Sequence, residues 1–353
     1  MRTKVIGFLF LLAIMASVGV IYFAESQQAE KAELSGYVGG EKIGLLEDEE
    51  VGKILDEEYR ISIDYAKAGS LDMVTEDLEG KDYLFPSSSI ALEYYESMYG
   101  KPERSEIVFN TPIVLYTYEK VLAALEQQGM VTRSREVCFV DMEKLLSLIL
   151  EEKEWSDIGL SELYGKIAVD TTDPAKSNSG NMFAALVANV LNGGETLTEA
   201  DLAEILPKLQ EIFGRLGYME TSSADLFSQF LRMGIGAKPI IAGYESQLLE
   251  YAVQEPEEYE RIKEDVVMLY PAPTVWSAHV LIALDEDGSR LIDGMLDEKI
   301  QDIGWKQHGF RTGNYSITED VKEIKVPGVA EDVTSVTPVP SFDVMEKIIE
   351  GLS

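Results

Sequence analysis

The chain has 353 residues, of which 46% are hydrophobic, enough to bury the cores of two domains. Its 63 Asp and Glu residues against 30 Lys and Arg residues give a formal net charge of −33. A surface this acidic repels nucleic-acid phosphates and anionic lipid headgroups, because binding either one needs clustered cations, so a nucleic-acid partner is not expected.

The N-terminal segment, residues 1–26, is predicted to be an uncleaved membrane anchor. Arg2 and Lys4 precede an uncharged stretch at 5–24, which at about 1.5 Å per residue spans roughly 30 Å of hydrocarbon. Positive residues stay cytoplasmic, so the remaining chain is expected to be extracytoplasmic and anchored to the cell membrane. The alternative is a cleaved signal and a secreted protein, although Tyr22 makes a poor cleavage site. Polar residues 27–33 are predicted to form a short tether.

Short apolar runs then alternate with segments of helical period, which predicts βαβ units and a mainly parallel sheet. Strands are expected at 36–38, 61–65, 83–85, 107–115, 137–140, 166–170, 239–242, 266–270 and 277–284. Helices are expected at 48–59, 88–98, 119–128, 142–151, 179–191, 199–214, 223–233, 247–253, 289–301 and 342–349.

Two long apolar runs with prolines in their middle predict crossings between two lobes. In "EIVFNTPIVLYTYEK", Pro112 cannot sit in a central ladder, so the run is expected to leave one sheet and enter another. The run "VVMLYPAPTVWSAHVLIAL", with Pro271 and Pro273, is expected to return. The predicted lobes are residues 34–111 with 272–353, and residues 112–271. The helix at 342–349 is expected to dock on the first lobe.

Catalytic and metal-binding motifs are absent from the sequence. There is no GxSxG, HExxH, phosphate-loop or CxxC pattern, so an enzyme is not expected. His279 and His308 have no carboxylate pattern around them, and no metal or cofactor is expected. The single cysteine, Cys138, excludes an intrachain disulfide and is predicted to be a buried thiol.

Seven stretches between Leu34 and Gly313 resemble, in order and spacing, the extracytoplasmic solute-binding proteins of bacterial uptake systems. They are "YVGGEKIGLLEDEEVGKIL", "YAKAGSLDMV", "DYLFPSSSIALEYYE", "FNTPIVLYTY", "DTTDPAKSNSGNMF", "AGYESQLLEY" and "LYPAPTVWSAHVLIALDEDG". Within that group the resemblance is to the type II architecture of molybdate- and sulfate-type binders. It implies an α/β, two-lobed periplasmic-binding-protein type II fold whose two hinge-crossing strands let the lobes close on a small solute.

Hydroxyl-rich helix starts are the first candidate ligand contacts. Ser87 and Ser88 occupy one start in the first lobe, and Ser177, Ser179 and Gly180 occupy another in the second. Helix starts present unpaired NH groups and about half a positive charge, so such clusters can cradle an oxyanion. The alternative is that the serines only cap their helices.

Three further positions complete the candidate set. Ser70 lies at a third helix start, and Lys42 is a candidate cation at the end of the first strand, with a solvent-facing lysine as the alternative. Tyr244 is a candidate because the resemblance implies an oxyanion-contacting tyrosine in its loop. The neighbouring Glu245 counts against it, since an inward carboxylate would repel an oxyanion or bind a cation.

The resulting functional hypothesis is a membrane-anchored solute-binding protein that delivers a small polar solute to the permease of an ABC-type system. An oxyanion is expected first and an amino acid second. The alternative is a sensory or structural binding protein of the same fold that works without a transporter.

Overall fold

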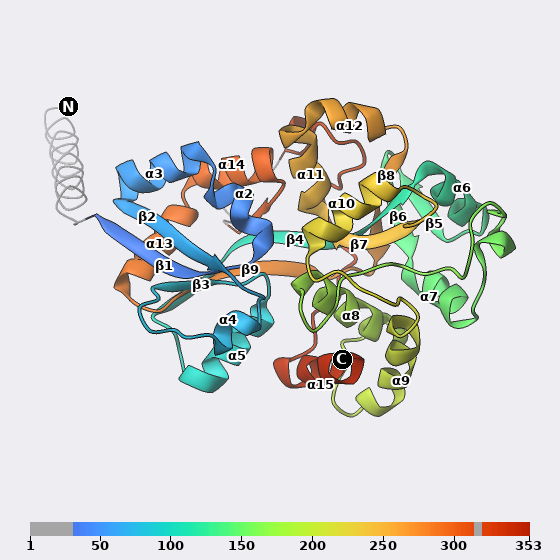
Figure 1. Ribbon diagram of the computed structural model, residues 1–353, viewed down its shortest axis with the longest axis horizontal. Coiled ribbons are helices and arrows are strands. Elements are labelled where there is room, and N and C mark those ends of the chain that lie inside the picture. The colour runs from blue at the N-terminus through green and yellow to red at the C-terminus, as the bar shows by residue number, and fades with distance from the viewer. Residues whose placement is uncertain (1–30, 314–319) are drawn as a thin grey trace, which may run out of the picture.

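The computed structural model describes residues 31–313 and 320–353. Its strands form two sheets that share β4 (Arg104–Tyr118), and helices on both faces of each sheet give two α/β halves lying side by side (Figure 1). The anchor expected at 5–24 lies outside the described residues. Among the helices at 31–313 and 320–353, none is long and apolar enough to cross a membrane.

The first sheet contains the N-terminal part of β4 and the strands at the start of the chain. Its order is β2 (Ile61–Lys67), β1 (Ala32–Val38), β3 (Tyr83–Phe85), β9 (Trp276–Ala283), β4 and β10 (Arg311–Thr312). Helices α3 (Glu49–Tyr59), α13 (Glu286–Met295) and α14 (Glu298–His308) pack on one face, and α4 (Asp72–Thr75) and α5 (Ser89–Tyr99) pack on the other. The short α2 (Ile43–Leu46) follows a 3-10 turn at Gly40–Lys42.

The second sheet contains the C-terminal part of β4. Its order is β7 (Ile240–Tyr244), β4, β8 (Val266–Ala272), β6 (Val137–Asp141) and β5 (Val131–Ser134). One face is covered by α6 (Glu119–Gln127), α7 (Met142–Leu150), α8 (Asn178–Leu191) and α9 (Leu202–Phe213), and the other by α10 (Ser223–Met233), α11 (Glu245–Gln254) and α12 (Pro256–Ile262).

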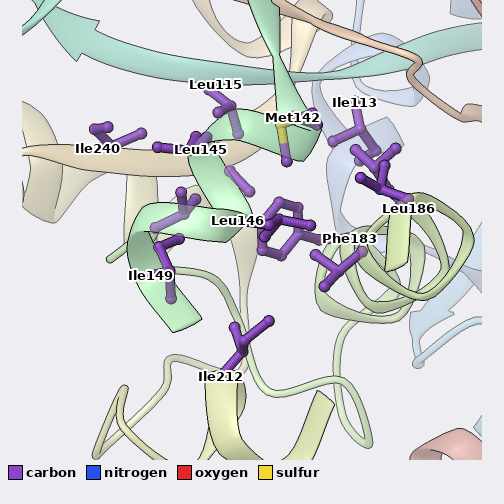
Figure 2. Close-up of a cluster of buried hydrophobic side chains, with 14 of the residues drawn as sticks. Ile113, Leu115, Met142, Leu145, Leu146, Ile149, Phe183, Leu186, Ile212 and Ile240 are labelled. Carbon is purple, nitrogen blue, oxygen red and sulfur yellow. The ribbon is translucent and has the colours of Figure 1, made fainter. Parts of the chain in front are cut away.

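Helix α8 is the central element of the larger core. It is buried along most of its length, and Phe183 lies beside Leu146 of α7 in a cluster that includes Leu145 and the strand residues Leu115 and Ile240 (Figure 2). A helix buried on nearly all sides lies inside a domain, between a sheet and other helices. Its start is thereby fixed at the border of the two halves.

The expectation of a mainly parallel sheet is wrong. Among the described strands, β1 pairs in parallel with β2 and β3, and β6 with β8, but all other pairings are antiparallel. The reason lies in β4, β8 and β9. Strand β4 runs from the first half to the second, whereas β8 and β9 lead the chain back, so they pair with β4 in the opposite direction.

The crossing predicted at Pro112 is present. Pro112 pairs with Trp276 of the first sheet, while Ile113 pairs with Tyr244 of the second. The return crossing consists of two strands, as the separate strands expected at 266–270 and 277–284 imply. Strands β8 and β9 are separated by residues 273–275, and Ile113 N donates to Val275 O at 3.0 Å beside them. Pro271 and Pro273 interrupt the ladder, which explains the break.

The end of the chain crosses between the halves a third time. Thr274 N donates to Ser335 O and Thr337 N to Thr274 O, both at 2.9 Å. Beyond this pairing, α15 (Phe342–Leu352) packs on α8 and α9, with Met345 buried in the larger core. The expectation that this helix docks on the first lobe is met only at its start, where Phe342 stacks on Tyr94 of α5 and Phe342 N donates to Glu93 Oε2 at 3.0 Å. The predicted lobe limits stay a prediction.

Several element limits also differ from expectation. Residues 166–170 make only isolated bridges at Lys166 and Asp170, and the helix expected at 289–301 is two helices, α13 and α14, with Asp297 capping the second. Strands β5 and β10 and helix α12 were not predicted, because they are short and lack a clear apolar period. Cys138 is buried, as predicted.

A substitution at Gly180 tests how tightly the start of α8 is packed. A β-carbon there would lie 2.2 Å from the Thr172 carbonyl oxygen, a backbone atom that cannot move aside alone. We expect Gly180→Ala to lower the free energy of unfolding by about 1–3 kcal/mol, measured by urea denaturation. The control is Gly52→Ala in α3, where a β-carbon meets no described atom within 4 Å. It should raise stability by about 0.5–1 kcal/mol. An equal response of both variants would contradict the tight approach.

Candidate ligand-binding site

A cavity of ≈ 290 Å³ lies between the two halves, at the carboxyl ends of three strands. Residues 39–41 follow β1, residues 67–70 end or follow β2, and Tyr244 ends β7. The starts of α8 and α10, at 176–178 and 221–224, close the other side. Open α/β sheets bind ligands at this edge, which makes the cavity the candidate site. A larger cavity of ≈ 690 Å³ is instead lined by the hinge strands and the chain at 331–340.

Two long helices present uncapped starts to this cavity. Ser177 precedes α8 and Ser222 precedes α10, both with extended backbone, yet neither side chain accepts a hydrogen bond from a backbone amide of its own helix. Ser177 Oγ lies 3.1 Å from Ser179 Oγ. The first-turn amides therefore have no side-chain cap, and the helix dipoles add a positive potential at the same place. This arrangement suits an anionic group.

A buried polar cluster lies behind the cavity wall of the first half. Lys42 is fully buried, and its Nζ donates to Glu41 Oε1 and Ser87 Oγ, both at 2.5 Å. His279 Nδ1 lies 3.3 Å from the same nitrogen. Burial lowers the pKa of Lys42, while the adjacent Glu41 carboxylate acts in the opposite direction. Glu41 thus compensates a cation that would otherwise be costly to bury.

His279 completes this cluster as a neutral group. Burial, reinforced by the Lys42 ammonium, holds the pKa of His279 well below its ordinary value. Its Nδ1 therefore accepts from Lys42 Nζ, and its proton belongs on Nε2, which has no partner in the described part of the chain. The T-shaped contact with Phe310, at 4.9 Å between ring centroids, fixes the ring.

Asn178 joins the two halves across the cavity floor. Its Nδ2 lies 2.8 Å from the Ser87 carbonyl oxygen of the first half, 3.0 Å from Tyr244 Oη and 3.3 Å from Ser277 Oγ. Ser277 Oγ also donates to the Ser87 carbonyl oxygen, at 2.6 Å. Tyr244 is buried, which raises the pKa of its phenol and keeps it protonated. The halves are therefore in contact at the site in this structure.

The structure places the eight predicted site residues in three groups. Ser70, Ser177 and Tyr244 line the cavity, and Lys42 and Ser87 lie directly behind it. The other three have structural partners: Ser88 Oγ caps α5 by accepting from Ile90 N, Ser179 Oγ lies 2.7 Å from Thr172 Oγ1, and Gly180 permits the approach to Thr172. Ligand contact by any of the eight stays a prediction.

Sequence reasoning missed several residues of the cavity wall. Glu41 and Lys67 were not singled out, and Ser222 and Ser223 were interpreted only as the start of a helix. Asn178 stands inside the hydroxyl cluster at 177–180 but was not singled out. The available signal was the position of these polar residues directly after strands β1 and β2 or directly before α8 and α10.

Glu245 does not face the cavity, so the objection it raised to an anionic ligand does not apply. Its side chain is fully buried, and its two oxygens accept from Arg311 Nε at 2.7 Å and Nη2 at 2.8 Å. Tyr270 Oη donates to the same carboxylate. Trp276 and Trp305 lie beside the guanidinium. This buried ion pair ties β10 of the first sheet to the start of α11 on the second.

Comparisons with known proteins support the fold. No family model matches the chain, and no curated protein matches it. Solved structures do match. The substrate-binding protein of an ABC transporter from Agrobacterium tumefaciens superposes with a TM-score of 0.57 at 13% identity, covering 92% of this chain and 96% of that one. The sulfate-binding protein of Mycobacterium tuberculosis gives 0.55 at 14% identity, with 90% and 96% covered.

A third match is a periplasmic binding protein of Actinobacillus pleuropneumoniae with fructose-6-phosphate bound. It gives a TM-score of 0.57 at 13% identity, covering 91% of this chain and 97% of that one. At such identities the likeness concerns the fold alone. The chain thus has the α/β fold of periplasmic solute-binding proteins, which are binding proteins rather than enzymes.

The Glu245–Arg311 pair can be tested by removing the cation. Arg311→Met leaves the Glu245 carboxylate buried without its cation, so we expect a loss of about 3–5 kcal/mol in unfolding free energy, measured by urea denaturation. The double variant Arg311→Met with Glu245→Gln should recover part of the loss. As a control, Arg104→Met breaks the exposed pair with Asp293 and should cost at most about 1 kcal/mol. Similar losses for Arg311→Met and Arg104→Met would contradict the assignment.

Proposed function

We propose that this protein is an extracytoplasmic binding protein that captures a small polar solute in the ≈ 290 Å³ cavity between its halves. The observation that carries the proposal is the construction of that cavity. Loops from both halves meet at the carboxyl ends of β1, β2 and β7, and Asn178 bridges them. A ligand held there would contact both halves and favour their contact.

The ligand proposed for this site is an oxyanion or a solute with an oxyanion group. Uncapped starts of α8 and α10, with Ser177 and Ser222, supply amide and hydroxyl donors. Such dipoles bind anions without a full counter-charge. The net charge of −33 does not oppose this, since screening limits distant surface charges and mainly the rate of encounter is lowered.

Anchoring by residues 1–26 and delivery to an ABC-type permease are part of the proposal. The structural likeness to a substrate-binding protein of an ABC transporter supports the second point. The alternative is a sensory or structural protein of the same fold that works without a permease. The uncleaved anchor predicted from the sequence favours this alternative. Both hypotheses, delivery to a permease and a role without one, include capture of the same ligand.

Thermal unfolding of the full-length chain tests ligand capture. The panel consists of molybdate, tungstate, sulfate, phosphate and representative amino acids and organic phosphates, all at equal ionic strength. A ligand present at 100 times its Kd should stabilise the folded chain by about 2.7 kcal/mol, seen as a raised Tm. If no member of the panel shifts the Tm, solute capture is not supported.

The location of the site is tested by a matched pair of serine variants. Ser177→Ala removes a hydroxyl that lines the cavity, and a ligand acceptor left without that donor should bind about 1–3 kcal/mol more weakly by calorimetry. Ser88→Ala removes a hydroxyl that caps α5 outside the cavity lining, so it should lower stability by about 1 kcal/mol without changing affinity. The reverse pattern would place the ligand elsewhere.

A further inference from the structure

The charges around the cavity differ in sign from those of the protein as a whole. Its lining contains Lys67 and Lys176 but only one acidic residue, Glu41, in a chain of net charge −33. The Glu41 charge is matched by the buried Lys42 behind it, 2.5 Å away. The Lys67 side chain has no hydrogen bond or ion pair within the described residues, and the Lys176 side chain has only an exposed ion pair with Asp173 at 3.4 Å. The lining is therefore net cationic.

The two lysines come from opposite halves. Lys67 is the last residue of β2 in the first half, and its side chain lies against Gly40, whose β-carbon would be 2.5 Å from Lys67 Cε. Lys176 precedes α8 in the second half. Together with the starts of α8 and α10 they surround one end of the cavity with positive potential. A group of charge −2 satisfies this arrangement better than a single carboxylate does.

The cavity is larger than an inorganic oxyanion. A volume of ≈ 290 Å³ corresponds to the space of roughly ten water molecules in the liquid. A tetrahedral oxyanion, with five heavy atoms, fills the smaller part of it. The site therefore has room for a ligand with a further part, which would extend from the anionic group past the loops at 39–41 and 67–70.

Glu41 indicates the chemistry of that further part. Its Oε1 takes the hydrogen bonds from Lys42 and Ser87, but its Oε2 has none within the described residues. The side chain is 13% exposed and lines the cavity. A carboxylate oxygen accepts hydrogen bonds only. Oε2 can therefore accept hydrogen bonds from a ligand with donors, which fully ionised sulfate and molybdate lack.

Resting on the proposed function of this site, we propose that the ligand is a phosphate monoester of a small polyol. Its dianionic phosphate would lie between Lys67, Lys176 and the starts of α8 and α10. Its hydroxyls would donate to Glu41 Oε2. The phosphate supplies three terminal oxygens for donors arriving from both halves, and the hydroxyls use the one acceptor that the protein leaves open.

The direct test compares ligands on the unchanged, full-length chain. Calorimetry at fixed ionic strength would measure glycerol 3-phosphate, methyl phosphate and sulfate. We expect glycerol 3-phosphate to bind at least about tenfold more tightly than methyl phosphate, which has the same charge but no hydroxyls, because a charged acceptor would be left unpaired. Equal affinity for glycerol 3-phosphate and methyl phosphate would overturn the polyol part of the proposal, and tighter binding of sulfate would overturn the phosphate monoester, while both results leave solute capture intact. No binding of any of the three, or of the wider panel, would remove solute capture itself.

Two variants test which side chains bind the phosphate and which bind the hydroxyls of the ligand. Lys67→Met should weaken glycerol 3-phosphate and methyl phosphate alike by at least about fivefold. Lys53→Met, which removes an exposed lysine of α3 outside the cavity lining, should change neither. Glu41→Gln should reduce the preference for glycerol 3-phosphate over methyl phosphate. If Glu41→Gln does not fold because Lys42 loses its counter-charge, the comparison of ligands on the unchanged chain still tests whether the hydroxyls contribute to binding.

Discussion

The backbone ladder of β4 is the constraint on which the rest of the structure depends. This one strand pairs with β9 and β10 before Pro112 and with β7 and β8 after it. Both sheets are thus built on a single continuous backbone, and the halves can change their relative position only by bending it near residues 110–113. The segment at 273–275 and the tail at 331–340 lie beside this point, and the Glu245–Arg311 pair is buried close to it.

The ladder also determines where a ligand can bind. Because β7 pairs with β4 just beyond the crossing, its last residue, Tyr244, faces the first half. Strands β1 and β2 end on the opposite side of the same gap. Helix α8, buried among α7, α9 and the sheet, places Asn178 and Ser177 between them. The polar groups of the site therefore come from elements whose positions are set by apolar packing and backbone pairing, which preorganises them without a ligand.

Much of the fold was predictable from local patterns. The amphipathic period located most of the helices, and the prolines at 112, 271 and 273 marked the crossing regions. Strand direction was not predictable, because alternating strands and helices suggest parallel pairing, whereas β8 and β9 return beside β4 and pair antiparallel to it. The position of α15 could not be predicted either, because an apolar face shows that a helix packs against the protein but not which neighbour it packs against.

For the candidate site, the sequence by itself determined the chemical character of the helix starts, because hydroxyl residues before an apolar helical run are a local pattern. Only the tertiary structure decided which of them line the cavity. Ser177 and Ser222 lie open to it, whereas Ser88 caps its own helix. Lys42 and Glu245 are buried because each has a charged partner beside it, Glu41 for Lys42 and Arg311 for Glu245. The packing of other elements holds these two partners in position. The energetic cost of burying a charge depends on its distance from its counter-charge, and that distance is a property of the fold.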